Sequence, residues 1–184
     1  MNLKLACLLT LLGLPTPLRA QTADTIPTYI GGVPVRARRP GTEFSGREAP
    51  ALLAAAFART ISLAVEASRG LARAKAYCLQ LAGGTGPLDP KPQVLASLER
   101  RGVPVRPASQ CETARNTAPP VLDPITGGRA WLVTLESLEL KAPGIWLLSA
   151  NYYVEPLFGA GWECRVHYES GAWVVRDCTM TWIA

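Results

Sequence analysis

The chain has 184 residues, of which 48% are hydrophobic and 18% are charged, and its formal net charge is +5. This composition is typical of a globular protein, and the length predicts one domain with enough mass for a sizeable core. The charge does not indicate a nucleic-acid partner, which would require clustered basic residues with interleaved aromatics. One small basic cluster exists, and we interpret it as part of a solvated linker rather than as a contact for anionic envelope polymers or lipid head groups: Arg36, Arg38 and Arg39.

The first 20 residues have the order of parts that is typical of an export signal. Lys4 supplies a positive charge, Leu5 to Leu14 form an apolar run, and Leu18-Arg19-Ala20 ends in a small residue suited to cleavage. The run is half the length of about 20 residues that a transmembrane helix needs. We therefore expect a signal peptide over residues 1–20 and a periplasmic or secreted mature protein without a transmembrane segment. Its net charge would be +3, from 17 basic and 14 acidic residues.

Four cysteines lie beyond residue 20: Cys78, Cys111, Cys164 and Cys178. In an exported chain they predict two disulfides, and sequence proximity favours Cys78–Cys111 and Cys164–Cys178. A hairpin with a two-residue turn at Ser170-Gly171 would point Cys164 and Cys178 to opposite faces of the sheet. The second pair therefore requires an irregular hairpin, with either a three-residue loop at Ser170-Gly171-Ala172 or a β-bulge.

Residues 21–47 are rich in proline and glycine, and we expect a flexible arm or linker there, followed by a single domain over residues 48–184. Helical spacing of apolar residues predicts a long helix over residues 49–76, with a possible break at Gly70. Residues 77–81, YCLQL, predict a short strand. A second helix is expected to start with Asp89 as its N-cap and to stop at Gly102.

The remaining sequence predicts strands over residues 130–140, 145–154, 161–168 and 173–183, which are rich in β-branched and aromatic residues and separated by turn residues. We therefore predict an α+β fold, in which an N-terminal long helix and a shorter second helix pack on a C-terminal four-stranded antiparallel meander. All five tryptophans fall in or beside the meander, where we expect core packing, with an aromatic-lined groove as the alternative.

No pattern predicts a metal site or a cofactor, because the mature chain has no Cys-x-x-Cys and His167 is its sole histidine. His167 shares a strand face with charged residues and is expected at the surface. One binding pocket is a candidate, bordered by Tyr152, Tyr168 and Asp177 if the sheet curves around the helix. Asp177 would be its buried acid; in the alternative interpretation Asp177 pairs with a neighbouring arginine at the sheet surface.

The order of the predicted elements resembles the cystatin/NTF2-like group of cone-shaped α+β folds over roughly residues 49–184. Two segments are similar to those of uncharacterised exported bacterial proteins: YCLQL with LDPKPQVLASLERRGVPVRPASQC, and the closing W-V-V…W-I of residues 173–183. The second resemblance implies no activity. Where NTF2-like proteins are isomerases, they use an acidic base and a phenol, but the spacing here matches none of their motifs, so no residue is carried over.

The leading functional hypothesis is an exported, disulfide-stapled domain that binds a protein, an envelope component or a small apolar partner without catalysis. The alternative is an NTF2-like pocket enzyme, of isomerase or hydrolase type, using Asp177 and a tyrosine. A third class, an inhibitor of an exported hydrolase, would use a protruding loop over residues 112–128.

Overall fold

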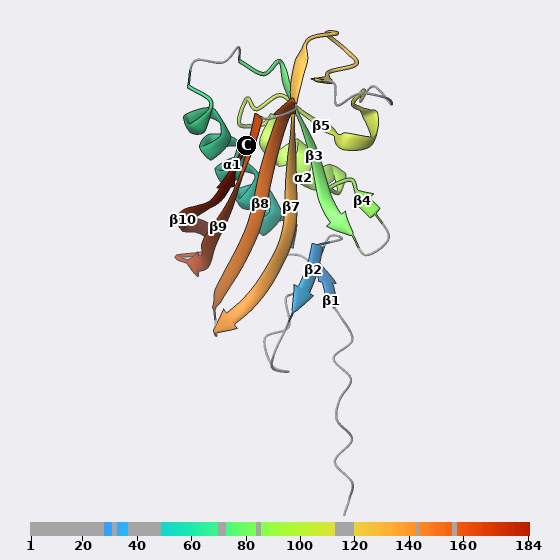
Figure 1. Ribbon diagram of the computed structural model, residues 1–184. Helices are drawn as coiled ribbons and strands as arrows, with labels where there is room; N and C mark the ends of the chain where they lie inside the picture. The colour runs from blue at the N-terminus through green and yellow to red at the C-terminus, as the bar shows by residue number, and fades with distance from the viewer. Residues whose placement is uncertain are drawn as a thin grey trace, which may run out of the picture.

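The computed structural model describes residues 28–30, 33–36, 49–69, 73–83, 86–112, 120–142, 144–155 and 158–184. These ranges contain two α-helices and ten strands, and all ten strands belong to one mixed sheet (Figure 1). The predicted signal peptide, most of the predicted arm and residues 113–119 of the predicted inhibitory loop lie outside the described residues.

The four longest strands are consecutive in the chain and pair in that order with antiparallel neighbours. They are β7 (Arg129–Ala142), β8 (Ile145–Glu155), β9 (Phe158–Glu169) and β10 (Ala172–Ile183). Along β8, buried residues alternate strictly with half-buried ones, as expected where one face of a sheet is covered and the other meets solvent.

The predicted fold, a four-stranded meander carrying two helices, is wrong because the sheet continues beyond β7. β3 (Ala76–Gly83) runs parallel to β7 from Ala76↔Ala130 to Leu81↔Leu135. Further along β7, β2 (Val33–Arg36) pairs with the same edge of that strand, also in parallel, at Val35↔Leu138. A parallel pair needs a long crossover connection, and residues 84–128 provide one between β3 and β7. Local sequence patterns do not reveal such a pairing.

Shorter strands complete the sheet. β1 (Thr28–Ile30) pairs with β2, so two strands fall inside the segment that was expected to be a linker. β4 (Gly86–Leu88) and β5 (Val105–Pro107) both pair with β3, and β6 (Val121–Leu122) pairs with the start of β7. β3 thus lies in the interior of the sheet, between β5 and β7.

The two helices are shorter than predicted. α1 covers Ala49–Ala67 and α2 covers Pro92–Glu99, followed by the 3₁₀ turn η1 (Ala108–Gln110). Lys91, not Asp89, occupies the N-cap of α2, while the Asp89 carboxylate accepts hydrogen bonds from the backbone and hydroxyl of Ser109. α2 ends three residues before Gly102, the predicted stop; this glycine lies in the turn that follows the helix and adopts φ +76°, which an L side chain disfavours.

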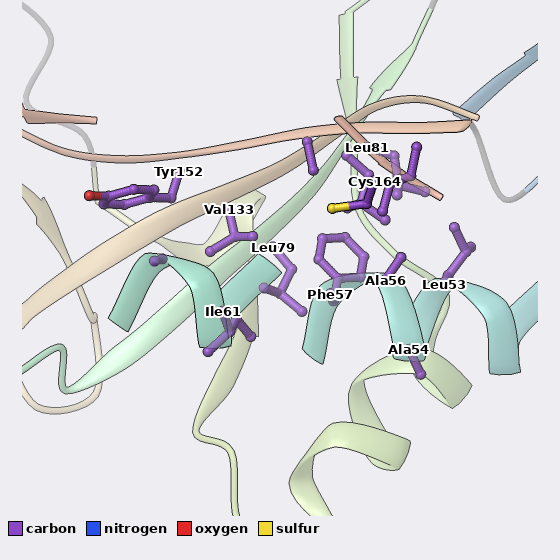
Figure 2. Close-up of a cluster of buried hydrophobic side chains, with 14 of the residues drawn as sticks. Leu53, Ala54, Ala56, Phe57, Ile61, Leu79, Leu81, Val133, Tyr152 and Cys164 are labelled. Carbon is purple, nitrogen blue, oxygen red and sulfur yellow. The ribbon is translucent and has the colours of Figure 1, made fainter. Parts of the chain in front are cut away.

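The main core lies between α1 and the sheet. Figure 2 shows Phe57 pointing from α1 toward Cys164 and Leu81, and Ala54 pointing away from the sheet toward α2. Phe57, Ala54 and Leu81 are fully buried. α1 is therefore apolar on two sides, because the sheet covers one and α2 covers the other. By length and composition Pro50–Ala67 could also cross a membrane, but half of this segment is buried within the domain.

Two disulfides join the predicted pairs, which confirms both pairings: Cys78–Cys111 and Cys164–Cys178. The hairpin of β9 and β10 has the two-residue turn, with Glu169 opposite Ala172. Its register shifts by one residue between Arg176 and Thr179, so the bulge, not the longer loop, brings Cys178 to Cys164. Asp177 lies in this bulge with φ +48°.

Candidate functional site

The structure separates the three residues that were predicted to share a pocket. Tyr152 is 1% exposed and stacks on Trp162, with ring centroids 5.5 Å apart, and burial raises the pKa of its hydroxyl. Tyr168 is half exposed and contacts Trp173 instead. The described residues border two cavities that are considered below, and neither is lined by Tyr152, Tyr168 or Asp177.

Asp177 is a surface residue. Its side chain is 64% exposed, and its carboxylate lies 3.8 Å from the Arg165 guanidinium. This placement matches the alternative interpretation, a surface ion pair, and not the buried acid of a pocket. Aspartate tolerates positive φ better than most residues, and this accounts for its position in the bulge.

The sheet face that carries Arg165 and Asp177 is polar along β7 to β10. Glu136 accepts hydrogen bonds from Ser149 and Asn151 across the β7–β8 pair. Half-buried His167 lies on the same face. This part of the sheet is therefore solvated. His167 lines neither of the two cavities described here.

The larger cavity lies on the helix-covered side of the sheet, beyond the C-terminal end of α1, and has a volume of about 610 Å³. This volume falls within the range of about 300–1,000 Å³ that is typical of small-molecule sites. Its lining comes from α1 and the following turn, the start of β3, the residue before β5 and the start of β7: Val65, Ser68, Arg69, Arg73, Ala74, Tyr77, Pro104 and Trp131.

Tyr77 and Trp131 form the aromatic corner of this cavity. The parallel β3–β7 pairing sets the two residues opposite each other, and their rings meet edge to face at 5.9 Å and 84°. Trp131 contacts Tyr152 at 5.8 Å, and Tyr152 stacks on Trp162. A row of four rings thus leads from the cavity across β3, β7, β8 and β9 into the core.

The charged groups of the cavity are all basic. Arg69 and Arg73 lie at its exposed rim, and neither forms an ion pair with any residue in the described part of the chain. Burial raises the pKa of the Tyr77 hydroxyl, while the positive charge of Arg73 acts to lower it, which places the Arg73 charge near the phenol. The cavity therefore combines aromatic walls with a cationic mouth.

One polar atom of Trp131 is enclosed by the protein, with almost no accessible surface of its own. Trp131 is 2% exposed, and its indole N–H is buried without a hydrogen-bond acceptor among the described residues. Buried indole N–H groups usually have an acceptor. By contrast, Ser68 is satisfied, because its hydroxyl donates to the carbonyl of Ala64 at 2.6 Å.

The second cavity, of about 410 Å³, lies on the opposite face of β3 beside Cys111. Its polar side chains already have partners within the protein. Asp89 accepts from Ser109, and the Gln80 amide donates to the Thr134 hydroxyl at 2.9 Å. This cavity therefore offers a ligand fewer unsatisfied groups than the larger one.

Sequence analysis did not identify the larger cavity. Arg69 and Arg73 fall inside the long helix that was predicted over residues 49–76, and Tyr77 was predicted only as part of a short strand. The alternation in YCLQL does place Tyr77, Leu79 and Leu81 on one face. The pairing with Trp131 depends on the long crossover and leaves no local pattern.

No protein-family model, curated protein or solved structure matches this chain. The resemblance to cystatin/NTF2-like folds and to exported bacterial proteins therefore remains a prediction. The parallel β3–β7 pair also departs from the simple meander on which the architectural resemblance was based.

Proposed function

We propose that this protein is an exported binding domain whose cavity beyond α1 holds a small, partly apolar molecule. The observation that carries the proposal is the aromatic corner of Tyr77 and Trp131 in a cavity of about 610 Å³. An apolar wall with a few polar groups at defined positions is the usual composition of a small-molecule site.

Export is supported by the sequence of residues 1–20 and by the two disulfides, which are compatible with an oxidising environment. Disulfides of this kind persist in the periplasm or outside the cell. A ligand for this site would therefore be a molecule present in one of those compartments.

The placement of Asp177 gives no support to the alternative, a pocket enzyme that uses this acid with a tyrosine. Asp177 lies on the solvated side of the β9–β10 hairpin, whereas Tyr152 points into the core on the other side of the sheet. The four mature cysteines are bonded in pairs, so none is available as a thiolate nucleophile.

The proposal predicts that the protein binds a neutral aromatic probe in this cavity. The probe is 1-naphthaleneacetamide, titrated into the full chain after export and purification, with chemical shifts and tryptophan fluorescence as readouts. A ligand of this size is expected to bind with a Kd of about 1 mM. Val65→Trp should abolish binding, because Val65 is 45% exposed and lines the cavity, so a larger ring would fill it.

The matched control is Ile125→Trp, which adds the same ring at an exposed position that lines neither cavity. This variant should bind the probe as the wild type does. Shift changes that avoid Tyr77 and Trp131, or equal loss of binding in both variants, would contradict the proposal.

A further inference from the structure

We infer that the ligand of this cavity is an aromatic or alicyclic carboxylate, which lies with its ring against Tyr77 and Trp131 and its carboxylate at Arg69 and Arg73. This inference rests on the proposed function and names the chemical class of the ligand. It follows from the charge of the cavity mouth and from the arrangement of the two rings.

The first argument is the charge of the lining. The described residues around the cavity include two arginines and no aspartate or glutamate. Elsewhere in the described chain, five arginines pair with carboxylates of the protein within 4 Å: Arg59, Arg106, Arg129, Arg165 and Arg176. The exposed Arg100 and Arg101 after α2 form no such pair with the described residues. Two guanidinium groups that border one cavity and lack such a partner provide the planar donors that a carboxylate binds best.

The second argument is the arrangement of the wall. Tyr77 and Trp131 meet at 84°, so a flat ring that stacks on one of them meets the edge of the other. The two charged side chains of the described lining are both cations, and they favour a ligand that brings acceptor oxygens.

A structural role for Arg69 predicts something different. Arg69 lies two residues beyond the end of α1, where a cation stabilises the helix dipole. In that role its loss would lower the stability of the fold slightly, and it would leave the choice between ligands unchanged. Ligand selectivity is therefore the property that separates the two roles.

The test compares two probes that differ in charge and share the same ring: 1-naphthaleneacetate and 1-naphthaleneacetamide. The wild type should bind the acetate about tenfold or more tightly than the amide, because hydrogen bonds to charged groups are stronger than neutral ones. This ratio should fall as salt is raised. In the double variant Arg69→Gln, Arg73→Gln the ratio should drop toward one, with the Kd of the amide unchanged. The control is Arg101→Gln, which removes an exposed cation that follows α2 and lies outside the cavity. This variant should keep the wild-type ratio of the two affinities.

The outcomes distinguish the inference from the proposed function. Equal affinity of the wild type for both probes would overturn the inference and leave the proposed function standing, whereas no binding of either probe would overturn both. A ratio that survives in the double variant would place the anion site elsewhere. Tighter binding of 1-naphthyl phosphate than of the acetate would overturn the assignment to a carboxylate. Thermal unfolding of each variant checks that the fold is intact.

Discussion

At the scale of single residues, Asp123 is a buried acid with several contacts to the protein. It is 1% exposed and receives hydrogen bonds from the Thr126 hydroxyl at 2.8 Å and the Ile125 amide at 3.3 Å, and Arg106 lies 3.5 Å away. Burial acts to raise the pKa of the Asp123 carboxyl, but the hydrogen bonds and the Arg106 charge outweigh it, and the pKa lies below its ordinary value. Asp123 thereby holds the turn that joins β6 to β7.

The depressed pKa predicts how stability changes with pH. Because the folded pKa is below the unfolded one, the contribution of Asp123 is fully present above the unfolded pKa of about 4 and is lost as the pH falls through the folded pKa. Asp123→Asn should lower the free energy of unfolding by about 1–3 kcal/mol at pH 7, since Arg106 keeps a buried atom without a counter-charge. Urea unfolding at pH 7, 5 and 3, with disulfides intact, should show this difference shrinking at pH 3.

Asp177→Asn is the control for this measurement. Its ion pair is exposed and contributes at most about 1 kcal/mol, and asparagine also tolerates positive φ. A loss of stability as large as that of Asp123→Asn, or a pH-independent effect of Asp123→Asn, would contradict the interpretation.

At the scale of elements, the hairpin of β9 and β10 shows how a glycine and a tryptophan shape one sheet edge. Trp182 is opposite Gly161, and a Cβ built on Gly161 would overlap the indole ring. Glycine in a strand often marks such a close approach. The Trp182 ring, 43% exposed, therefore covers backbone that a larger residue would push away.

This contact predicts a strong coupling between the two positions. Gly161→Ala should lower stability by about 1 kcal/mol or more, because the new methyl group displaces the indole. In a Trp182→Ala background the same change should cost nothing, since the obstructing ring is gone. A double-mutant cycle by urea unfolding measures the coupling, and equal effects of Gly161→Ala in both backgrounds would rule out the contact.

At the scale of the whole molecule, each disulfide ties a strand of the sheet to a segment that lies further along the chain. Cys78–Cys111 ties β3 to the segment after η1 across 33 residues, and Cys164–Cys178 ties β9 to β10 across 14. The chain-entropy model assigns about 4 kcal/mol to the longer loop and about 3 kcal/mol to the shorter one.

Removing the Cys78–Cys111 disulfide should therefore lower the free energy of unfolding more than removing the Cys164–Cys178 disulfide. The variants are Cys78→Ala with Cys111→Ala, and Cys164→Ala with Cys178→Ala, measured by equilibrium unfolding without reductant. The wild type in reductant should lose more stability than either variant. A wild-type midpoint in the first variant would show that the longer disulfide adds nothing to the fold.

Part of this structure was predictable because it depends on short-range patterns. The strands β7 to β10 follow from alternation and turn residues, and α1 follows from helical spacing. An irregularity in the β9–β10 hairpin follows from parity, since Cys164 and Cys178 would otherwise point to opposite faces, and the structure shows that it is a bulge and not a longer loop. Helix ends were less accurate, because Asp89 bonds Ser109 rather than capping α2.

The sequence by itself determined the disulfide pairing and the local elements, because each depends on residues that are close in the chain. It also predicts the export signal, which depends on a short local pattern in the same way. Only the tertiary structure decided that β3 inserts parallel to β7 and that Asp177 faces solvent. It alone brought Tyr77 to Trp131 and placed Arg69 and Arg73 at the same cavity. The physical reason is that the pairing of distant strands is selected by the packing of the whole sheet on α1, while periodicity reports only which face of its own element a residue occupies.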